Sequence, residues 1–424
     1  MTRRLLFVGS VAALLAGAIA CQSPQSDRDG VEARTTLRVA MFPYLPALGA
    51  NGEFAKRIEQ EFEGLHPDVD LELLVDPSID YYDPFVVAGW LRSKSSDGKR
   101  KEPFDLVEID TVLLGTLVDM EAIAEWPHGD TDLVRAGYEA SRLDGRQYGV
   151  PHWLCGHFII TEDEAIARAD TIDKLVVALE AAKTPRPNLV GNLLGSWNTA
   201  ALYIDAWADS RSNPDPLEAI RLPLDADVVA CLVTFASQGM DAGANPCIDG
   251  TFNNWEDPDL APTRFGKGKA DALFGYSERV YHAQLAGADP SKLFVRSAPL
   301  GRGSDPVWFA DIWVAPIYDD EAVPALAQKA RHDAARRFVA YINTPSTFEW
   351  IHFNKDAVGG KAVPRYLIPA TISAFKDTAI GQDPVMKQIW PLLDEGTFYP
   401  QRRLPGLRRA MGAAVKSAWA AGGK

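Results

Sequence analysis

The segment from residue 37 to residue 75 constrains the fold most strongly, because its hydrophobic pattern changes from strand to helix and back to strand. It opens with the apolar run LRVAMFPYLP, which two prolines end. Phe54, Ile58 and Phe62 then recur every fourth residue, as in an amphipathic helix, and LELLV has the composition of a second strand. A strand, a helix and a strand at this spacing predict a βαβ unit with a parallel sheet.

The remaining chain repeats this alternation. FDLVEID predicts a strand that ends at Asp110, and TVLLGTLVDM predicts a helix that begins near Thr111. Asp110 would then lie at the carboxyl end of a strand, where open α/β sheets bind ligands. VWFADIWVAP predicts a late strand, and helices are expected at TIDKLVVALEAAK, TAALYIDAWAD, DADVVACLVTFASQGM, PGLRRAMGAAVKSAWAA and from about residue 327 to 343. This pattern suggests two α/β lobes with a cleft between them.

The segment YGVPHWLCGHFII contains the thiol Cys155 and connects the two halves of the pattern. It is apolar and extended, but it contains Pro151, so we expect an edge strand or a crossover rather than a central strand. Crossings between lobes are expected near Val150 and near Leu300. The predicted division is 36–150 plus about 301–345 for lobe 1, and 151–300 plus about 346–424 for lobe 2.

The first residues predict export. Arg3 and Arg4 precede an uncharged, apolar run that ends at Ala20, as in a secretory signal peptide over residues 1–20. AIAC resembles a bacterial lipobox, in which Cys21 would be lipidated and anchor the protein in the cell envelope; a soluble secreted protein cut near Ala20 is the alternative. Residues 21–35 are polar and free of aromatic residues, which is typical of a flexible tether.

The formal net charge of −14 bears on the partners. It argues against a nucleic acid, because phosphate-binding surfaces need clustered Lys and Arg, and it suits a small cationic ligand. No His or Cys cluster has the spacing of a metal site, so neither a metal nor a cofactor is expected.

Three cysteines remain besides Cys21. Cys231 and Cys247 lie close in sequence and can pair in an oxidising compartment, which would leave Cys155 as a lone thiol. Alternatively, Cys231 is a small buried apolar residue within a predicted helix. The sequence leaves both possibilities open.

Several motifs carry a resemblance to known proteins. The opening strand–helix–strand unit and the crossover resemble the extracellular solute-binding proteins of bacterial importers, which have two hinged α/β lobes. Within that fold, DG-xx-YGVPHWLCG, LLGSWNTAALYIDAWAD, FGYSERVY and FADIWVAP resemble the thiaminase I family, the thiamine pyridinylases, over nearly the whole mature chain. YGVP alone is a weak signal, whereas Cys155 followed by a Tyr-Ser-Glu run that ends at Glu278 is more specific. The resemblance implies a two-lobe periplasmic-binding-protein-like fold of type II, with a hinge and an interdomain cleft.

The resemblance also implies a mechanism. In that family a Cys thiolate attacks the aminopyrimidine ring of thiamine, the thiazole leaves, and an external amine or thiol takes its place. Cys155 would be the nucleophile, and Glu278 would be the general base, because a thiol at neutral pH is only slightly ionised without help. Burial near Phe274 and Tyr276 would have to raise the pKa of Glu278. The partners would be thiamine and a small amine or thiol, and the protein would be a monomer.

Aromatic faces and carboxylates complement the permanent positive charge and flat pyrimidine of thiamine. The resemblance assigns these substrate-binding roles to Phe42, Tyr44, Tyr82, Asp110, Tyr276 and Asp311. At two positions the match to the family is incomplete. Phe42 stands where the family has a tyrosine, which removes one phenol hydroxyl, and the loop at Asp80 leaves the choice between Tyr81 and Tyr82 open.

Two other functions fit the same motifs. A non-catalytic binding protein for thiamine or a related pyrimidine would deliver its ligand to an importer, and a sugar-binding lipoprotein of the same fold would use the same aromatic residues. In either, Cys155 would be a small buried residue and Glu278 a solvated carboxylate paired with Arg279. The Cys155 and Glu278 pair separates the enzyme from these alternatives.

Overall fold

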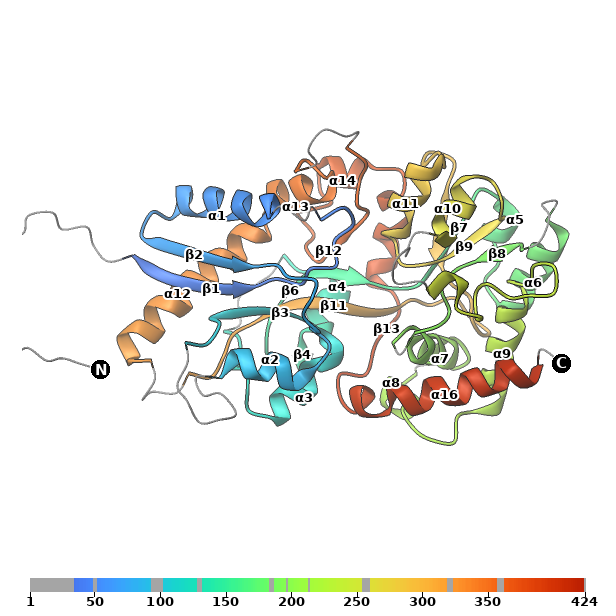
Figure 1. Cartoon of the computed structure of the whole chain (residues 1–424), viewed down its shortest axis with the longest axis horizontal. Helices are drawn as coiled ribbons and strands as arrows, with labels where there is room; N and C mark the ends of the chain where they lie inside the picture. The colour runs from blue at the N-terminus through green and yellow to red at the C-terminus, as the bar shows by residue number, and fades with distance from the viewer. Residues whose placement is uncertain are drawn as a thin grey trace, which may run out of the picture.

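The structure is a computed structural model that describes residues 34–48, 52–92, 102–127, 132–182, 187–195, 197–212, 214–253, 260–318, 323–356 and 362–422. The predicted signal peptide, Cys21 and nearly all of the predicted tether lie outside these ranges. Figure 1 shows an elongated molecule in which two groups of strands follow one another along its longest axis. In the described part of the chain, no helix combines the length and the apolar character needed to span a membrane.

The larger sheet forms the left part of Figure 1 and has the strand order β12-β6-β11-β3-β1-β2, with β13 beside β11. Strands β1, β2 and β3 are parallel to one another, and β11 runs antiparallel to both β3 and β6. The strands are β1 (Thr35–Ala40), β2 (Val69–Leu74), β3 (Leu106–Asp110), β6 (Val150–Cys155), β11 (Val307–Val314), β12 (Ile368–Pro369) and β13 (Thr397–Phe398).

The predicted βαβ unit is confirmed. Helix α1 (Glu53–Leu65) connects β1 to β2 and buries Phe54, Ile58 and Phe62, the three residues that set the helical period. Helix α12 (Ala325–Ile342) packs near β1 and corresponds to the helix expected from about residue 327. The hydrophobic period therefore identified both the first strands and the helices that cover them.

The smaller sheet, to the right in Figure 1, has the order β10-β7-β9-β8. Its strands are β7 (Phe158–Thr161), β8 (Leu189–Val190), β9 (Ala272–Gly275) and β10 (Phe294–Ser297). The helices around it are α5 (Glu164–Ala167), α6 (Ile172–Ala181), α10 (Leu260–Gly266) and α11 (Arg279–Ala286), and α7 (Asn198–Asp209), α9 (Ala226–Ser237) and α16 (Leu404–Gly422) pack together beside them.

The other elements are short or peripheral. They are α2 (Pro84–Leu91), η1 (Thr111–Leu113), α3 (Leu114–Asp119), α4 (Arg135–Ala140), β4 (Arg142–Leu143), β5 (Arg146–Gln147), α8 (Pro216–Ala219), η2 (Thr251–Asn253), α13 (Pro345–His352), α14 (Ala379–Gln382), α15 (Met386–Ile389) and η3 (Trp390–Asp394).

The segment YGVPHWLCGHFII forms two strands, β6 and β7, one in each sheet. Strand β7 pairs with β10 on one side and β9 on the other, so the expectation of an edge strand is wrong there, whereas a crossover does lie in this segment. In β6, Pro151 is tolerated because the register with β11 shifts between Asp311 and Ile312, which relaxes the ladder next to the missing N–H.

The chain passes between the two sheets after Cys155 and returns between β10 and β11. The short strand β12 pairs with β6, so part of the chain beyond residue 345 also joins the larger sheet. The exact lobe boundaries, at residues 150, 300 and 345, remain predictions.

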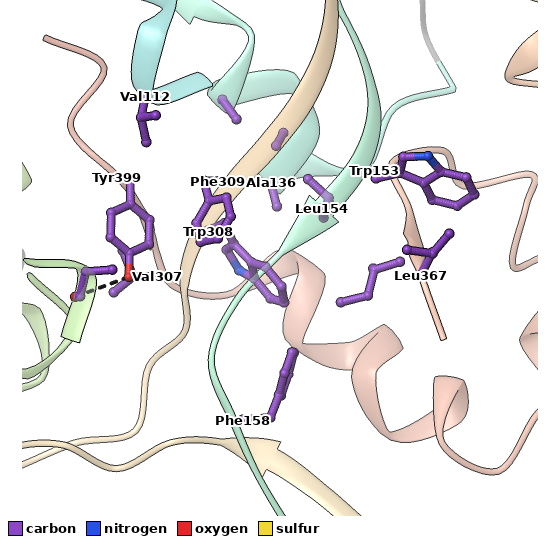
Figure 2. Packing of buried hydrophobic residues seen from close by; sticks show 14 of the residues in the cluster. Val112, Ala136, Trp153, Leu154, Phe158, Val307, Trp308, Phe309, Leu367 and Tyr399 are labelled. Atoms are coloured by element: carbon purple, nitrogen blue, oxygen red, sulfur yellow. Dashed lines mark hydrogen bonds between the residues drawn. The ribbon is translucent and has the colours of Figure 1, made fainter. Parts of the chain in front are cut away.

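One continuous hydrophobic core supports both crossings. Figure 2 shows Leu154 of β6 and Trp308 and Phe309 of β11 gathered at the junction of the two sheets, with Phe158 of β7 nearby. The rings of Phe158 and Trp308 lie 6.2 Å apart, across the point where the chain changes sheets. Cys155, at the end of β6, is therefore held by closely packed hydrophobic side chains.

Candidate functional site

Cys155 lies at the carboxyl end of β6, opposite Phe309 of β11, and the residue as a whole is half-buried. Burial raises the pKa of the Cys155 thiol well above its ordinary value, and the negative charges of Asp311, Glu278 and Asp110 raise it further. The thiol is therefore protonated at neutral pH, and it can act as a nucleophile only if a neighbouring base removes its proton.

Asp110 and Asp311, here called the acid pair, face each other across the antiparallel strands β3 and β11. Desolvation raises the pKa of Asp110 to about 7, although hydrogen bonds from the Val112 amide, at 2.9 Å, and from the Tyr82 hydroxyl oppose the rise. Desolvation also raises the pKa of Asp311 far above its usual range, and the charges of Glu108 and Asp110 add to the effect. Two carboxyls this close share a proton or attract a cation.

Glu278 immediately precedes α11 and follows β9, so it reaches the site from the smaller sheet. Burial raises the pKa of Glu278, while the charges of Arg279 and His157 lower it. Its negative charge acts on Cys155 and on Asp311, which shows that the three groups share one electrostatic environment. Residues from both lobes thus meet around the thiol, and we call Cys155, Glu278 and the acid pair the thiol–carboxyl cluster.

Three aromatic residues expected at the first strand and the following loop lie together. The ring of Phe42 lies 4.8 Å from that of Tyr44 and 5.5 Å from that of Tyr82, and Tyr44 and Tyr82 stack at 6.1 Å. Tyr82 also packs against Trp197, whose ring lies 4.9 Å away at the start of α7. The hydrogen bond from Tyr82 to Asp110 joins this aromatic group to the acid pair.

The structure places the side chains of Tyr81 and Tyr82 on different sides of their loop. Tyr81 is completely buried, and its ring packs 5.1 Å from that of Trp90, on the core side of the loop. The carboxylate of Asp80 accepts a hydrogen bond from the Tyr82 amide at 3.0 Å and forms a tight turn that directs the two tyrosines to different sides. Tyr82, not Tyr81, therefore lies beside the acid pair.

Tyr276 lies between β9 and Glu278, with its ring against the site. The ring stacks on His157 at 4.6 Å and meets Phe309 edge-on at 5.7 Å. Desolvation raises the pKa of Tyr276 well above its ordinary value, and the charges of Cys155 and Glu278 raise it further. Its phenol therefore stays protonated and can donate a hydrogen bond.

Sequence reasoning missed one carboxyl of the site, Glu108. Its side chain is fully buried, accepts a hydrogen bond from the Phe42 amide at 3.0 Å and pairs with His152 Nδ1 at 2.5 Å. Glu108 thereby fixes the end of β1 from which Phe42 projects. A signal existed in FDLVEID, because residues 108 and 110 alternate with apolar ones and so lie on one face of a strand.

Cys155, Cys231 and Cys247 are all free thiols in the structure, so Cys231 and Cys247 are not paired. Cys247 is buried, and its thiol lies 3.7 Å from the carbonyl oxygen of Leu189. Among the described residues, no group of three or more His, Cys, Asp or Glu side chains is arranged to hold a metal ion.

Comparisons with known proteins identify the fold. No family model matches the chain, and no curated protein matches its sequence. Among solved structures, it is similar to thiaminase I from Bacillus thiaminolyticus, with 18% identity, a TM-score of 0.65 and coverage of 91% of this chain and 99% of that one. It is also similar to Clostridium botulinum thiaminase I in complex with thiamin, with 18% identity, a TM-score of 0.68 and coverage of 92% and 100%.

A receptor shares the same architecture. The GacH receptor of Streptomyces glaucescens, described without ligand and with acarbose, has 15% identity, a TM-score of 0.61 and coverage of 92% of this chain and 97% of that one. Identities this low establish the fold and leave the activity open. The chain has the two-lobe α/β fold of type II that thiaminase I shares with solute-binding proteins, as its sequence predicted.

Proposed function

We propose that this protein is a thiamine pyridinylase, which transfers the pyrimidinylmethyl group of thiamine to an amine or a thiol. The observation that supports this proposal is the thiol–carboxyl cluster: one protonated thiol, Cys155, shares its surroundings with Glu278 and with the acid pair. A receptor that only binds a solute has no chemical need for a thiol beside a base of raised pKa.

In the first proposed step, Glu278 takes the proton of Cys155, and the sulfur attacks the aminopyrimidine ring beside a ring nitrogen. This attack places negative charge on the ring. The acid pair suits this charge, because burial raises the pKa of Asp110 to about 7, so that a proton remains available there near neutral pH. The methylene–nitrogen bond then breaks, its electron pair stays on the thiazolium nitrogen, and the thiazole leaves as a neutral molecule.

In the second step, the amine or thiol attacks the methylene carbon and the sulfur of Cys155 leaves the ring. As the sulfur leaves, Glu278 returns to it the proton taken in the first step, and the carboxylate regenerated in this way accepts the proton of the incoming nucleophile and passes it to solvent. The aromatic group of Phe42, Tyr44 and Tyr82 supports binding of the flat, cationic substrate, because ring faces attract cations and the acid pair lies next to them. Phe42 lacks a hydroxyl, so binding at that position rests on ring contact alone.

Incubation with thiamine and aniline tests the proposal by the release of free thiazole alcohol. We expect release by the wild type, a loss of at least about 100-fold in Cys155→Ala and in Glu278→Gln, and unchanged release in Cys231→Ala, which removes the thiol of another half-buried cysteine. Absence of release by the wild type, or normal release by Cys155→Ala, would show that the protein is not this enzyme.

The second candidate is a non-catalytic binding protein for thiamine or another small solute. The similarity to a receptor favours it, because that structure covers 92% of this chain, as the Clostridium botulinum thiaminase I structure does. Calorimetry with thiamine separates the two: a receptor would bind thiamine in a simple titration, and its ligand would be recovered intact in the presence of aniline.

We also propose that the protein is exported, that it acts as a monomer, and that a lipid on Cys21 anchors it to the cell envelope. A protein with this anchor stays with the membrane fraction, whereas Cys21→Ala would be released as a soluble protein. If both forms are equally soluble, Cys21 carries no lipid.

A further inference from the structure

Behind Tyr276 lies a buried polar group that the proposed chemistry does not use. It consists of His157, which follows Cys155 by two positions, Asp205 on α7, and Tyr399, which follows β13. These residues are 7%, 6% and 3% exposed, respectively. Buried polar groups of this kind persist only when hydrogen bonds satisfy them, so their arrangement has a specific purpose.

The carboxylate of Asp205 holds the group together. Its Oδ2 lies 2.6 Å from Nδ1 of His157, and its Oδ1 accepts a hydrogen bond from the hydroxyl of Tyr399. The Tyr399 hydroxyl also lies 3.3 Å from the carbonyl oxygen of Ala201. The contact between Oδ2 and Nδ1 of His157 fixes the orientation of the imidazole.

Two ring contacts also hold the same imidazole. Phe274 stacks on His157 at 5.0 Å and Tyr276 stacks on it at 4.6 Å. Phe309 contacts both tyrosines of this region: its ring lies 5.7 Å from that of Tyr276 and 5.0 Å from that of Tyr399. Figure 2 shows Tyr399 beside Phe309, with one hydrogen bond of its hydroxyl drawn as a dashed line.

We propose that His157 and Asp205 are a positioning pair for the base of the reaction: Asp205 orients the imidazole, which supports the ring of Tyr276 and places positive charge near Glu278. This inference rests on the proposed function and deepens it. Neither residue takes part in the proposed steps. His157 acts through Glu278 and Tyr276, and it is not itself a catalytic residue.

The charges around Glu278 explain why such a pair is needed. Burial raises the pKa of Glu278, and a protonated carboxyl cannot act as a base. Cys155, Tyr276 and Asp311 all lie in its electrostatic environment, and none of them carries a positive charge. Within the described part of the chain, Arg279 and His157 are the two side chains whose electrostatic contributions lower the pKa of Glu278.

Two variants separate a positioning role from a merely structural one. His157→Gln removes the ring and its charge, and Tyr399→Phe removes a hydrogen bond to the same carboxylate while leaving the imidazole in place. We expect both to lower the melting temperature. Only His157→Gln should move the acid limb of the kcat/KM profile for thiamine, to higher pH by roughly one unit, because the pKa of Glu278 rises when a nearby cation is lost.

The proposal would be overturned if the acid limb of the kcat/KM profile did not move in His157→Gln. It would also be overturned if Tyr399→Phe moved that limb by the same amount. If His157→Gln does not fold, Asp205→Asn replaces it, since the imidazole then lacks its carboxylate partner and the limb should move in the same direction. Carbon-13 NMR titration of the Glu278 carboxyl, assigned by its absence in Glu278→Gln, follows the same shift without turnover. An inactive wild type would therefore overturn the proposed function, while the titration would still decide whether His157 controls Glu278.

Discussion

At the scale of single residues, the acid pair places two carboxyl groups where one charge disfavours the other. Asp110 and Asp311 occupy facing positions on β3 and β11, and they are 3% and 8% exposed. Like charges in facing positions destabilise a sheet, and burial increases this cost. The pair therefore lowers the stability of the fold.

This arrangement predicts an unusual pH dependence of stability. Because burial raises the folded-state pKa of Asp110 to about 7 and that of Asp311 far above its usual range, these two carboxyls bind more protons in the folded protein than in the unfolded chain above pH 4. The free energy of unfolding should thus fall as the pH rises from about 4 to about 7. Asp311→Asn should raise this free energy by about 2 kcal/mol at pH 7 and flatten the slope.

Urea denaturation at several pH values measures this effect. Asp76→Asn is the control, since the side chain of Asp76 forms exposed hydrogen bonds with Ser78 and its replacement should not stabilise the protein. A destabilised Asp311→Asn would mean that the acid pair is satisfied by partners and does not repel itself.

The limits of sequence reasoning also show at the residue scale. The resemblance selected Tyr82, Asp110, Tyr276 and Asp311, and the structure brings them around Cys155. The choice between Tyr81 and Tyr82 could not be made, because it depends on a turn held by the Asp80 side chain. Partners such as Asp205 could not be found either, since they lie on elements far from the site in sequence.

At the scale of elements, the return crossing before β11 is tied to the end of α7 by Asp209. Its Oδ2 accepts a hydrogen bond from the Leu300 amide at 2.8 Å, and its backbone carbonyl accepts one from the Arg302 amide at 3.1 Å. Desolvation raises the pKa of Asp209 to about 9, with Asp205 and Asp305 contributing, so the carboxyl is neutral at pH 7. It acts there as a hydrogen-bond acceptor and not as an ion.

The effect of a substitution at Asp209 on the free energy of unfolding should therefore depend on whether the new side chain keeps a hydrogen-bond acceptor, and not on its charge. Asp209→Asn retains an oxygen for the Leu300 amide and should leave the free energy of unfolding at pH 7 within about 1 kcal/mol of the wild type, whereas Asp209→Ala leaves that amide without a partner and should lower it by about 1 to 3 kcal/mol. Chemical denaturation of both variants gives the answer. Equal losses would indicate that the ionised form matters.

Elements were easier to predict than their pairing. Local periodicity revealed α1, β3, α7, α9, β11 and α16, because each buries a regular stripe or run of apolar residues. It could not reveal that β11 runs antiparallel between β3 and β6, or that the two residues of β12 return to pair with β6. Those pairings join segments far apart in sequence, which a local pattern does not record.

At the scale of the whole molecule, a contact between Tyr82 and Trp197 joins the two lobes. Tyr82 precedes α2 on the side of the larger sheet, Trp197 begins α7 beside the smaller one, and their rings lie 4.9 Å apart. The guanidinium of Arg408, from α16, covers the Trp197 ring at 3.8 Å. Its Nε and Nη1 are buried and lack a hydrogen-bond partner among the described residues, so water would satisfy them if the lobes separated.

Trp197→Ala should therefore favour an open form. We expect a larger radius of gyration by small-angle X-ray scattering, and a dissociation constant for thiamine about fivefold higher, since one aromatic contact contributes about 1 kcal/mol. Trp390→Ala is the control, because Trp390 packs on Phe375 away from this contact. An unchanged radius would show that Trp197 does not hold the lobes together.

The position of Cys155 next to the first crossing has a mechanical consequence. Only Gly156 and His157 separate β6 from β7, and a side chain at residue 156 would meet the ring of Trp308 at 3.1 Å. A point beside a rotation axis moves little when two bodies turn about it. When the lobes rotate, the sulfur should stay nearly still while Glu278, on the other lobe, travels along an arc. The proposed nucleophile, Cys155, would thus lie close to the rotation axis, and rotation of the lobes would bring the proposed base, Glu278, to it.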